Sequence, residues 1–292
     1  MFDKVLVALD FSAHSREILE RIPEIPGVKE VVLMHVVDAT HPSKKVSIHG
    51  PEVGEARIRM AEGREYLERH GREGPVRAGT RVDLITEGSV AGRILAAAWD
   101  LGAGLIVLGA RGTNPIEEIL LGSVSSSVLR QAGAHVLVLR PGGGGQAGGS
   151  PPGTAPGLFS RVLVPTDFST PAGGVVALLR ELRGPGEILL LHVVSHAESE
   201  AELAELVKDS EARLSALRED LHATGTRVKV RIRVGDPAEM ILSVAREDDV
   251  SLIAMNAHGK DRVPGHLLGT TTFSVVRKAQ APVLVFRTVE KT

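Results

Sequence analysis

The chain has 292 residues, of which 43% are hydrophobic and 24% are charged, and its formal net charge is −2. This length and composition fit two globular domains with hydrophobic cores. The near-neutral balance, with one Trp, one Tyr and six Phe, argues against a nucleic-acid partner, which would require a basic surface and stacking rings. Because the chain has no cysteine, disulfides, thiolate metal sites and cysteine nucleophiles are excluded.

The first residues are unlike a signal peptide. Residues 1–7, MFDKVLV, lead directly into an apolar strand. No apolar run approaches the roughly 18 residues that a transmembrane helix requires. We therefore expect a cytoplasmic protein without a membrane partner.

Apolar strands and amphipathic helices alternate along the first half, which predicts a doubly wound α/β fold with a mostly parallel, five-stranded sheet. Ser89 before Val90 is a helix N-cap signal. In such sheets the ligand lies beyond the carboxyl ends of the strands, where the strand order reverses, and Asp10 and Gly109 fall at that level. The strands are expected near residues 4–9, 30–37, 80–86, 104–109 and 135–140, and the helices near 13–22, 52–70, 90–101 and 123–132.

Glycines after the fourth strand indicate a phosphate site. Gly109 and Gly112 are expected to turn the backbone with positive φ and to permit close approach of a ligand. Gly122 and Ser123 begin the next helix, whose first amides favour an anion. A glycine turn followed by an ordinary serine N-cap explains a single copy of this pattern equally well.

The pattern is repeated, because the chain is an internal duplication. The segment 141–157 contains twelve Gly or Pro residues out of seventeen and predicts a flexible linker. On either side of it, Lys4–Ser12 corresponds to Arg161–Ser169, and the second strands share a Leu/Met-His-Val-Val sequence. We expect domain 1 over residues 1–141, a linker over 142–157 and domain 2 over 158–292.

Both halves resemble the universal stress protein family. Gly109, Gly112, Gly122 and Ser123 match the family's ATP-binding pattern of Gly, two residues, Gly, nine residues, Gly and Ser or Thr. The resemblance implies two Rossmann-like domains, similar to adenine nucleotide alpha hydrolases. It also implies an ATP-binding protein with a regulatory or protective role in the stress response, with no catalytic residues and no metal bound by side chains.

The resemblance assigns the nucleotide contacts of the first half. Asp10 is expected beside the adenosine, although an acid at a strand end is as often a helix N-cap. Arg111 adds positive charge, and the serine hydroxyls are expected to donate to phosphate. ATP or another adenine nucleotide is the expected ligand, and Mg²⁺ is expected with its phosphates. The expected contacts are Ala8, Asp10, Val36, Gly109, Arg111, Gly112, Thr113, Asn114, Gly122, Ser123, Val124 and Ser125.

The second half departs from the pattern at its first glycine, which is Asn256. If this position needs a left-handed backbone, Asn costs about 1–2 kcal/mol, or roughly tenfold in affinity. We therefore expect a weaker site in the second half. Its expected contacts are Pro165, Asp167, Val193, Asn256, Gly259, Gly269, Thr270, Thr271 and Thr272.

Three further expectations concern assembly and chemistry. The fifth strands of the family pair across a dimer, so residues 136–139 and 283–286 are expected to pair within this chain as a pseudo-dimer; a homodimer is a further expectation. A slow ATPase or other nucleotide-using enzyme is the alternative function, and a scaffold without nucleotide is a third. His35 and His192 lie inside apolar strands and are expected to be structural rather than ligands.

Overall fold

The computed structural model describes residues 2–12, 14–40, 47–71, 76–110, 121–140, 157–169, 175, 186–222, 225–259 and 268–287. The chain divides into two compact units, Met1–Pro141 and Gly142–Thr292. Most of the expected linker over 142–157 lies outside the described residues. Within the described ranges, no helix is both long and apolar enough to cross a membrane.

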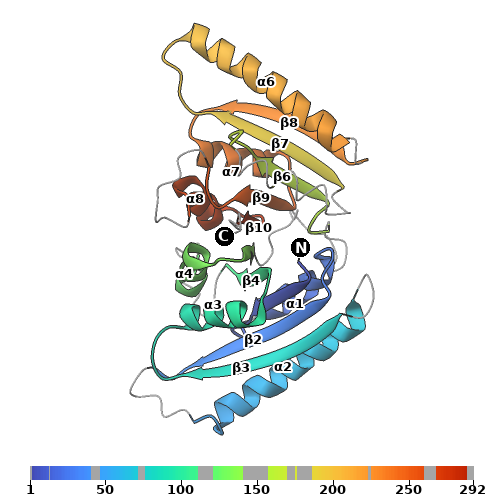
Figure 1. The fold of residues 1–292 in the computed structure, drawn as a ribbon, viewed down its shortest axis with the longest axis vertical. Coiled ribbons are helices and arrows are strands. Elements are labelled where there is room, and N and C mark those ends of the chain that lie inside the picture. Colours follow the sequence, from blue (N-terminus) through green and yellow to red (C-terminus); the bar gives the residue numbers. More distant parts are fainter. Residues whose placement is uncertain are drawn as a thin grey trace. The chain divides into compact units, whose positions relative to one another are not determined.

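The first unit alternates strands and helices as predicted (Figure 1). Ser89 is the N-cap of the third helix, since its hydroxyl accepts a hydrogen bond from the Gly92 amide at 3.0 Å. The elements are β1 (Lys4–Ala8), α1 (Ser15–Arg21), the 3₁₀ helix η1 (Ile22–Glu24), β2 (Glu30–Asp38), α2 (Pro51–His70), β3 (Arg77–Ile85), α3 (Val90–Leu101), β4 (Leu105–Gly109), α4 (Ser123–Gln131) and β5 (His135–Leu139).

The strands of the first unit form a parallel sheet in the order β3-β2-β1-β4-β5. The strand order reverses between β1 and β4, which pair over Val5–Val7 and Leu105–Val107. Helix α1 contacts α2, and α3 packs against α4. Right-handed connections that run in opposite directions from β1 place these helix pairs on opposite faces of the sheet. This arrangement confirms the predicted doubly wound α/β fold.

The second unit repeats this topology, with the strand order β10-β9-β6-β7-β8 and parallel pairing between neighbours. Asp236 is a helix N-cap, since its carboxylate accepts a hydrogen bond from the Glu239 amide at 2.9 Å, and Pro237 follows it. The elements are β6 (Arg161–Pro165), β7 (Glu187–Val194), α6 (Glu200–His222), β8 (Arg227–Val234), α7 (Pro237–Glu247), β9 (Leu252–Asn256), α8 (Thr270–Lys278) and β10 (Val283–Phe286).

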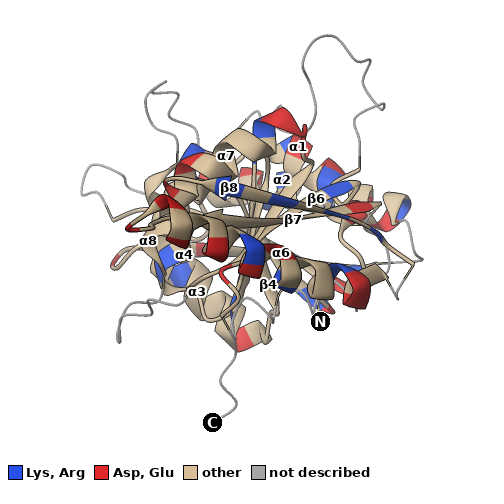
Figure 2. Ribbon diagram, turned by 90° about the horizontal axis from the view of Figure 1, so that it is seen from above, with Lys and Arg blue, Asp and Glu red and all other residues tan. Residues whose placement is uncertain are grey.

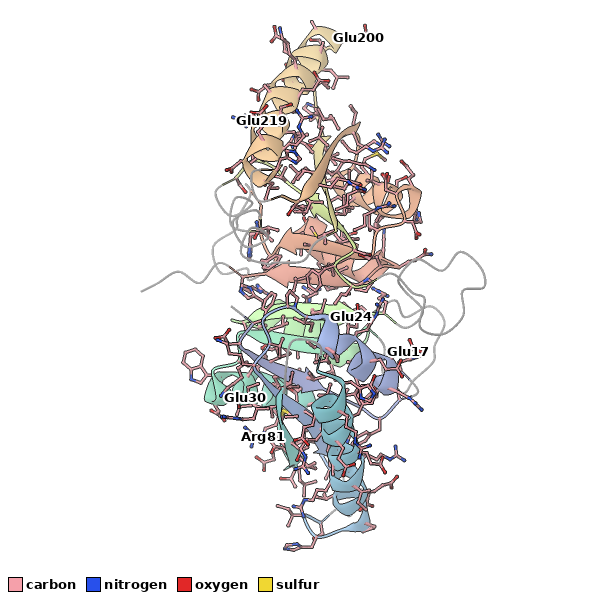
Figure 3. All side chains as sticks on the ribbon, turned by 90° about the vertical axis from the view of Figure 1, so that its right-hand side faces the viewer. Glu17, Glu24, Glu30, Arg81, Glu200 and Glu219 are labelled. Atoms are coloured by element: carbon pink, nitrogen blue, oxygen red, sulfur yellow. The ribbon has the colours of Figure 1, made fainter. Side chains whose placement is uncertain are left out.

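Charged side chains line the outer strands β3 and β8. On β3, Arg81 (Figure 3) lies 3.0 Å from Asp83 Oδ2, which also accepts from Arg93 Nε at 2.7 Å. Strand β8 carries a cation at every second residue from Arg227 to Arg233 (Figure 2). Such charges discourage pairing with another strand, which protects the sheet from aggregation.

One carboxylate of the second unit is buried at the start of β7. The Glu187 side chain is 9% exposed, and its two oxygens each lie 3.0 Å from a cation, Arg161 Nε and Lys229 Nζ. These cations come from the two strands that flank β7. The carboxylate therefore ties β6, β7 and β8 together at their amino ends.

We expect Glu187→Gln to destabilise the second unit. The change leaves two cations without their shared counter-charge; because both are partly exposed, the cost is about 1–2 kcal/mol. The melting temperature should fall by roughly 2–8 °C, measured by calorimetry. Glu205→Gln removes the same charge from an exposed position on α6 and is the control. Equal shifts in both variants would contradict a structural role for Glu187.

Candidate functional site

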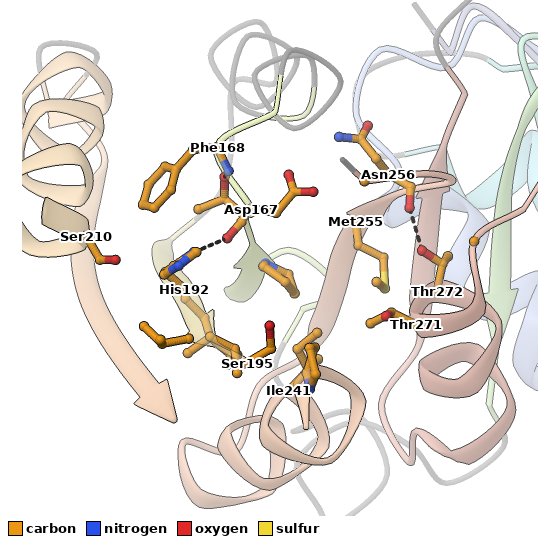
Figure 4. Close-up of a pocket in the computed structure, with 18 of the residues that line it drawn as sticks. Asp167, Phe168, His192, Ser195, Ser210, Ile241, Met255, Asn256, Thr271 and Thr272 are labelled. Carbon is orange, nitrogen blue, oxygen red and sulfur yellow. Dashed lines mark hydrogen bonds between the residues drawn. The ribbon is translucent and has the colours of Figure 1, made fainter. Parts of the chain in front are cut away.

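A pocket of about 420 Å³ opens at the carboxyl ends of β6, β7 and β9 in the second unit (Figure 4). This is the point where the strand order of that unit reverses, as expected for a ligand site in a doubly wound sheet. The volume lies in the range of small-molecule sites. All nine residues predicted for the second half line it: Pro165, Asp167, Val193, Asn256, Gly259, Gly269, Thr270, Thr271 and Thr272.

The turn after β6 carries the acid of the pocket. Asp167 Oδ1 accepts hydrogen bonds from the Ser169 amide at 3.0 Å and from the Ser169 hydroxyl at 2.5 Å. The Phe168 amide donates to Thr166 Oγ1 at 3.1 Å. Asp167 therefore closes a tight turn on itself, which leaves its second oxygen to face the glycine loop.

Gly259 lies directly against this acid. A Cβ atom built on Gly259 would overlap the Asp167 carboxylate at Oδ2. The position has no positive φ, so the glycine is required by close approach and not by backbone conformation. The contact brings the end of β6 and the loop after β9 together at one place.

The start of α8 forms the opposite wall. Gly269 is its N-cap, and the Gly269 amide donates to the Ala257 carbonyl at 2.7 Å. The amides of the first turn, Thr270–Thr272, have no earlier carbonyl within the helix to bond, so they and the helix dipole present a positive end to the pocket. This wall is suited to an anion such as phosphate.

Hydroxyl groups in the first turns of α4 and α8 donate hydrogen bonds to the last carbonyl of the preceding strand. We call these two hydrogen bonds the latches. Thr272 Oγ1 donates to the Asn256 carbonyl at 2.8 Å, and Ser125 Oγ donates to the Gly109 carbonyl at 2.7 Å. Both side chains are buried. The Ser125 hydroxyl therefore holds α4 against β4 in this structure, and its donation to phosphate stays a prediction.

The first unit shares these features where it is described. Asp10 follows β1, and Gly109 ends β4, so the two lie at the ends of neighbouring strands. The Gly122 amide donates to the Ala110 carbonyl at 2.7 Å, which matches the Gly269 contact. Ala8 ends β1, Val36 lies in β2, and Ser123 and Val124 begin α4. The predicted contacts Arg111, Gly112, Thr113 and Asn114 lie outside the described residues.

Two expectations about the backbone are wrong. Gly109 and Asn256 each end a strand, and neither is among the described residues with positive φ. Extended backbone is open to any residue, so Asn256 carries no left-handed penalty. The difference between the units at this position is a side chain: an amide at Asn256 and none at Gly109.

Asp10 is not the N-cap of α1, which is His14. Its Oδ1 instead accepts from the Ser12 amide at 3.0 Å and the Ser15 hydroxyl at 3.1 Å. The acid therefore stabilises the turn between β1 and α1, as Asp167 does after β6.

The strand histidines make the expected structural hydrogen bonds. Nδ1 of His35 donates to the Leu9 carbonyl at 2.7 Å, and Nδ1 of His192 donates to the Thr166 carbonyl at 2.8 Å. Burial lowers the pKa of His35, since it disfavours the charged ring, although the Leu9 carbonyl opposes this effect. His192 also lines the pocket, which the sequence reading did not anticipate.

The sequence did not predict the pocket wall that α6 forms. The α6 residues Leu206, Asp209, Ser210 and Arg213 follow helical spacing and face the pocket. Phe168 also lines it and contacts both Arg213 and His192. Arg59 lies over Phe11 in the same way in the first unit.

Comparison with known proteins places these features in a family. The model of the Universal stress protein family matches residues 1–140 and 158–287. Universal stress protein MJ0577 of Methanocaldococcus jannaschii is 29% identical over 155 residues, covering 44% of this chain and 96% of that protein. Universal stress protein Rv2005c of Mycobacterium tuberculosis is 33% identical over 196 residues, covering 63% of this chain and 62% of that protein.

A solved structure has the same two-unit organisation. A universal stress protein from Archaeoglobus fulgidus superposes with a TM-score of 0.70 at 26% identity, covering 99% of this chain and 97% of that chain. A putative universal stress protein from Pseudomonas aeruginosa has a TM-score of 0.66 at 18% identity, a likeness of fold alone.

We expect Gly259→Ala to destabilise the second unit by about 1–2 kcal/mol, because the new methyl group displaces the Asp167 carboxylate from its turn. Calorimetry of the single variants and of the double variant with Asp167→Ala measures the coupling. Gly259→Ala should cost little once Asp167 is removed. Gly54→Ala, where nothing lies within 4 Å of the added Cβ, is the control. If the losses of stability in the two single variants simply add in the double variant, the contact between Gly259 and Asp167 is contradicted.

The pKa of His35 also gives a pH dependence. Because its folded-state pKa is lowered, the contribution of neutral His35 is fully present above the unfolded pKa near 6.5 and is lost as pH falls through the folded value. We expect His35→Gln to flatten the decline in melting temperature between pH 7 and pH 4. An unchanged slope in that variant would show that other groups cause the decline.

Proposed function

Because the chain belongs to the universal stress protein family and carries two copies of its domain, we propose that it binds ATP or a related adenine nucleotide in each unit. Nucleotide occupancy then governs a regulatory or protective role in the stress response. The proposed activity is nucleotide binding, and no catalytic step is assigned.

The observation that carries the proposal is the pocket of the second unit. It joins an anion-binding helix start, an acid and a close-approach glycine at the reversal of the sheet. A nucleotide needs these three features: amides that bind phosphate, a carboxylate that accepts from hydroxyl or amino groups, and room for the nucleotide to approach the protein backbone. The first unit contributes the complete glycine pattern of Gly109, Gly112, Gly122 and Ser123.

We propose that the first unit binds the nucleotide more tightly than the second. The reason is the side chain of Asn256, which lines the pocket where the first unit has the hydrogen of Gly109. Mg²⁺ is proposed to accompany the phosphates, held by phosphate oxygens and water.

The pairing of residues 136–139 with 283–286 as a pseudo-dimer also remains a proposal. The support for this proposal comes from each unit by itself. Strand β5 is an edge strand of the first unit's sheet, and β10 is an edge strand of the second unit's sheet. An edge of apolar residues such as VLVL and VLVF is unsuited to water.

The test is nucleotide binding by the full chain. We expect acid extraction of the mildly purified protein to release an adenine nucleotide, and calorimetry of the stripped protein to show two sites for ATP. Gly122→Val should remove the tighter site and Gly269→Val the weaker one, because each puts a side chain at the start of an anion-binding helix. The Gly54→Ala variant should keep both sites.

The proposal fails if the stripped chain shows no heat with ATP and no nucleotide is extracted. The proposed positions of the two sites are wrong if both valine variants bind ATP as the parent chain does.

A further inference from the structure

Phenylalanine occupies an unusual backbone conformation after the first strand of each unit. Phe11 has φ of 59° and Phe168 has φ of 60°. A bulky residue is rarely left-handed, because its Cβ atom then lies too close to the following carbonyl oxygen. Such strain persists where the surroundings fix it, and it is concentrated at functional sites.

Each ring contacts a histidine ring and an arginine guanidinium. The Phe168 ring lies 4.4 Å from the His192 ring at 30°, and the Arg213 guanidinium carbon lies 5.1 Å from the Phe168 centroid. The first unit repeats this stack: Phe11 lies 4.2 Å from His35 at 31°, and Arg59 lies 5.3 Å from Phe11. We call each set the clasp: Arg213, Phe168 and His192 in one unit, and Arg59, Phe11 and His35 in the other.

An acid one turn earlier orients the arginine of each clasp. Asp209 Oδ2 lies 3.2 Å from Arg213 Nε, and Glu55 Oε1 lies 2.6 Å from Arg59 Nη2. The sequence pattern of glycines does not include these helix residues, yet both units place them alike. Repetition of an acid, an arginine, a strained phenylalanine and a histidine indicates a common purpose.

The geometry of the turn shows what the clasp holds. Phe168 points toward α6, whereas Asp167, its neighbour, points the opposite way toward Asn256 (Figure 4). Rotation of one residue therefore moves the other. With the ring held, Asp167 Oδ2 stays against Gly259 and Oδ1 stays on Ser169.

We propose that the clasps are positioning devices: Arg213 and Phe168 hold Asp167 in the orientation that meets the ligand, and Arg59 and Phe11 do the same for Asp10. The role in ligand binding rests on the proposed function. The role in holding the turn does not. Arg213 and Asp209 have side chains that are 52% and 62% exposed, so their ion pair adds little to stability.

Hydrogen exchange of the Ser169 amide, followed by NMR in the full chain, tests the turn directly. Arg213→Ala should speed this exchange roughly two- to fivefold. Phe168→Gly should speed it more, although glycine removes the backbone strain. Arg213→Lys should restore most of the protection, and Arg218→Ala, an exposed arginine on the same helix, should change nothing. Unchanged exchange in both Arg213→Ala and Phe168→Gly would overturn the proposal.

A double-mutant cycle on ATP affinity tests the link to the ligand. In the full chain with the first site removed by Gly122→Val, Arg213→Ala should weaken ATP binding roughly two- to fivefold and should have no effect once Asp167→Ala is present. Equal effects in both backgrounds would overturn action through Asp167. If the parent chain binds no ATP at all, the proposed function fails, whereas the exchange measurement still decides whether the clasp holds the turn.

Discussion

The reversal of strand order is the constraint on which the rest of each unit depends. Strands β1 and β4, or β6 and β9, pair in parallel, yet their connections leave toward opposite faces of the sheet. The carboxyl ends of these two strands are therefore not covered by a connecting helix. In the second unit the acid turn after β6 and the loop after β9 meet at this uncovered place, with the positive end of α8 beside them.

Each wall of the pocket is kept in position by contacts among the residues that form it. The latches from Ser125 and Thr272 hold the helix start against its strand. The clasps hold the acid turn from the side of α2 or α6. Such contacts between neighbouring side chains allow a site to keep its geometry without a bound ligand. They also explain why hydroxyl groups and rings near the pocket need not touch the ligand to matter.

The sequence predicts the layout better than the local conformations. Apolar strands alternating with capped helices suffice for the fold, because burial on both sheet faces leaves a readable pattern. All nine residues expected in the second half line one pocket. The prediction of a left-handed backbone at Gly109 and Asn256 was wrong. A glycine can instead be required because a neighbouring group leaves no room for a Cβ atom, as at Gly259. The strain at Phe168 escaped prediction because no residue type announces it; the ring is held by an arginine 45 positions later in the sequence.

The contacts of the Phe168 ring have a consequence for the ligand. The His192 ring lies 4.4 Å from the Phe168 ring, and the Arg213 guanidinium carbon lies 5.1 Å from its centroid, so both side chains occupy space that a planar ligand would need in order to stack on Phe168. Face stacking accepts almost any flat ring, because every base has a π-face. For the nucleotide proposed above, recognition of the base would then rest on the donors and acceptors along its rim and not on stacking against Phe168.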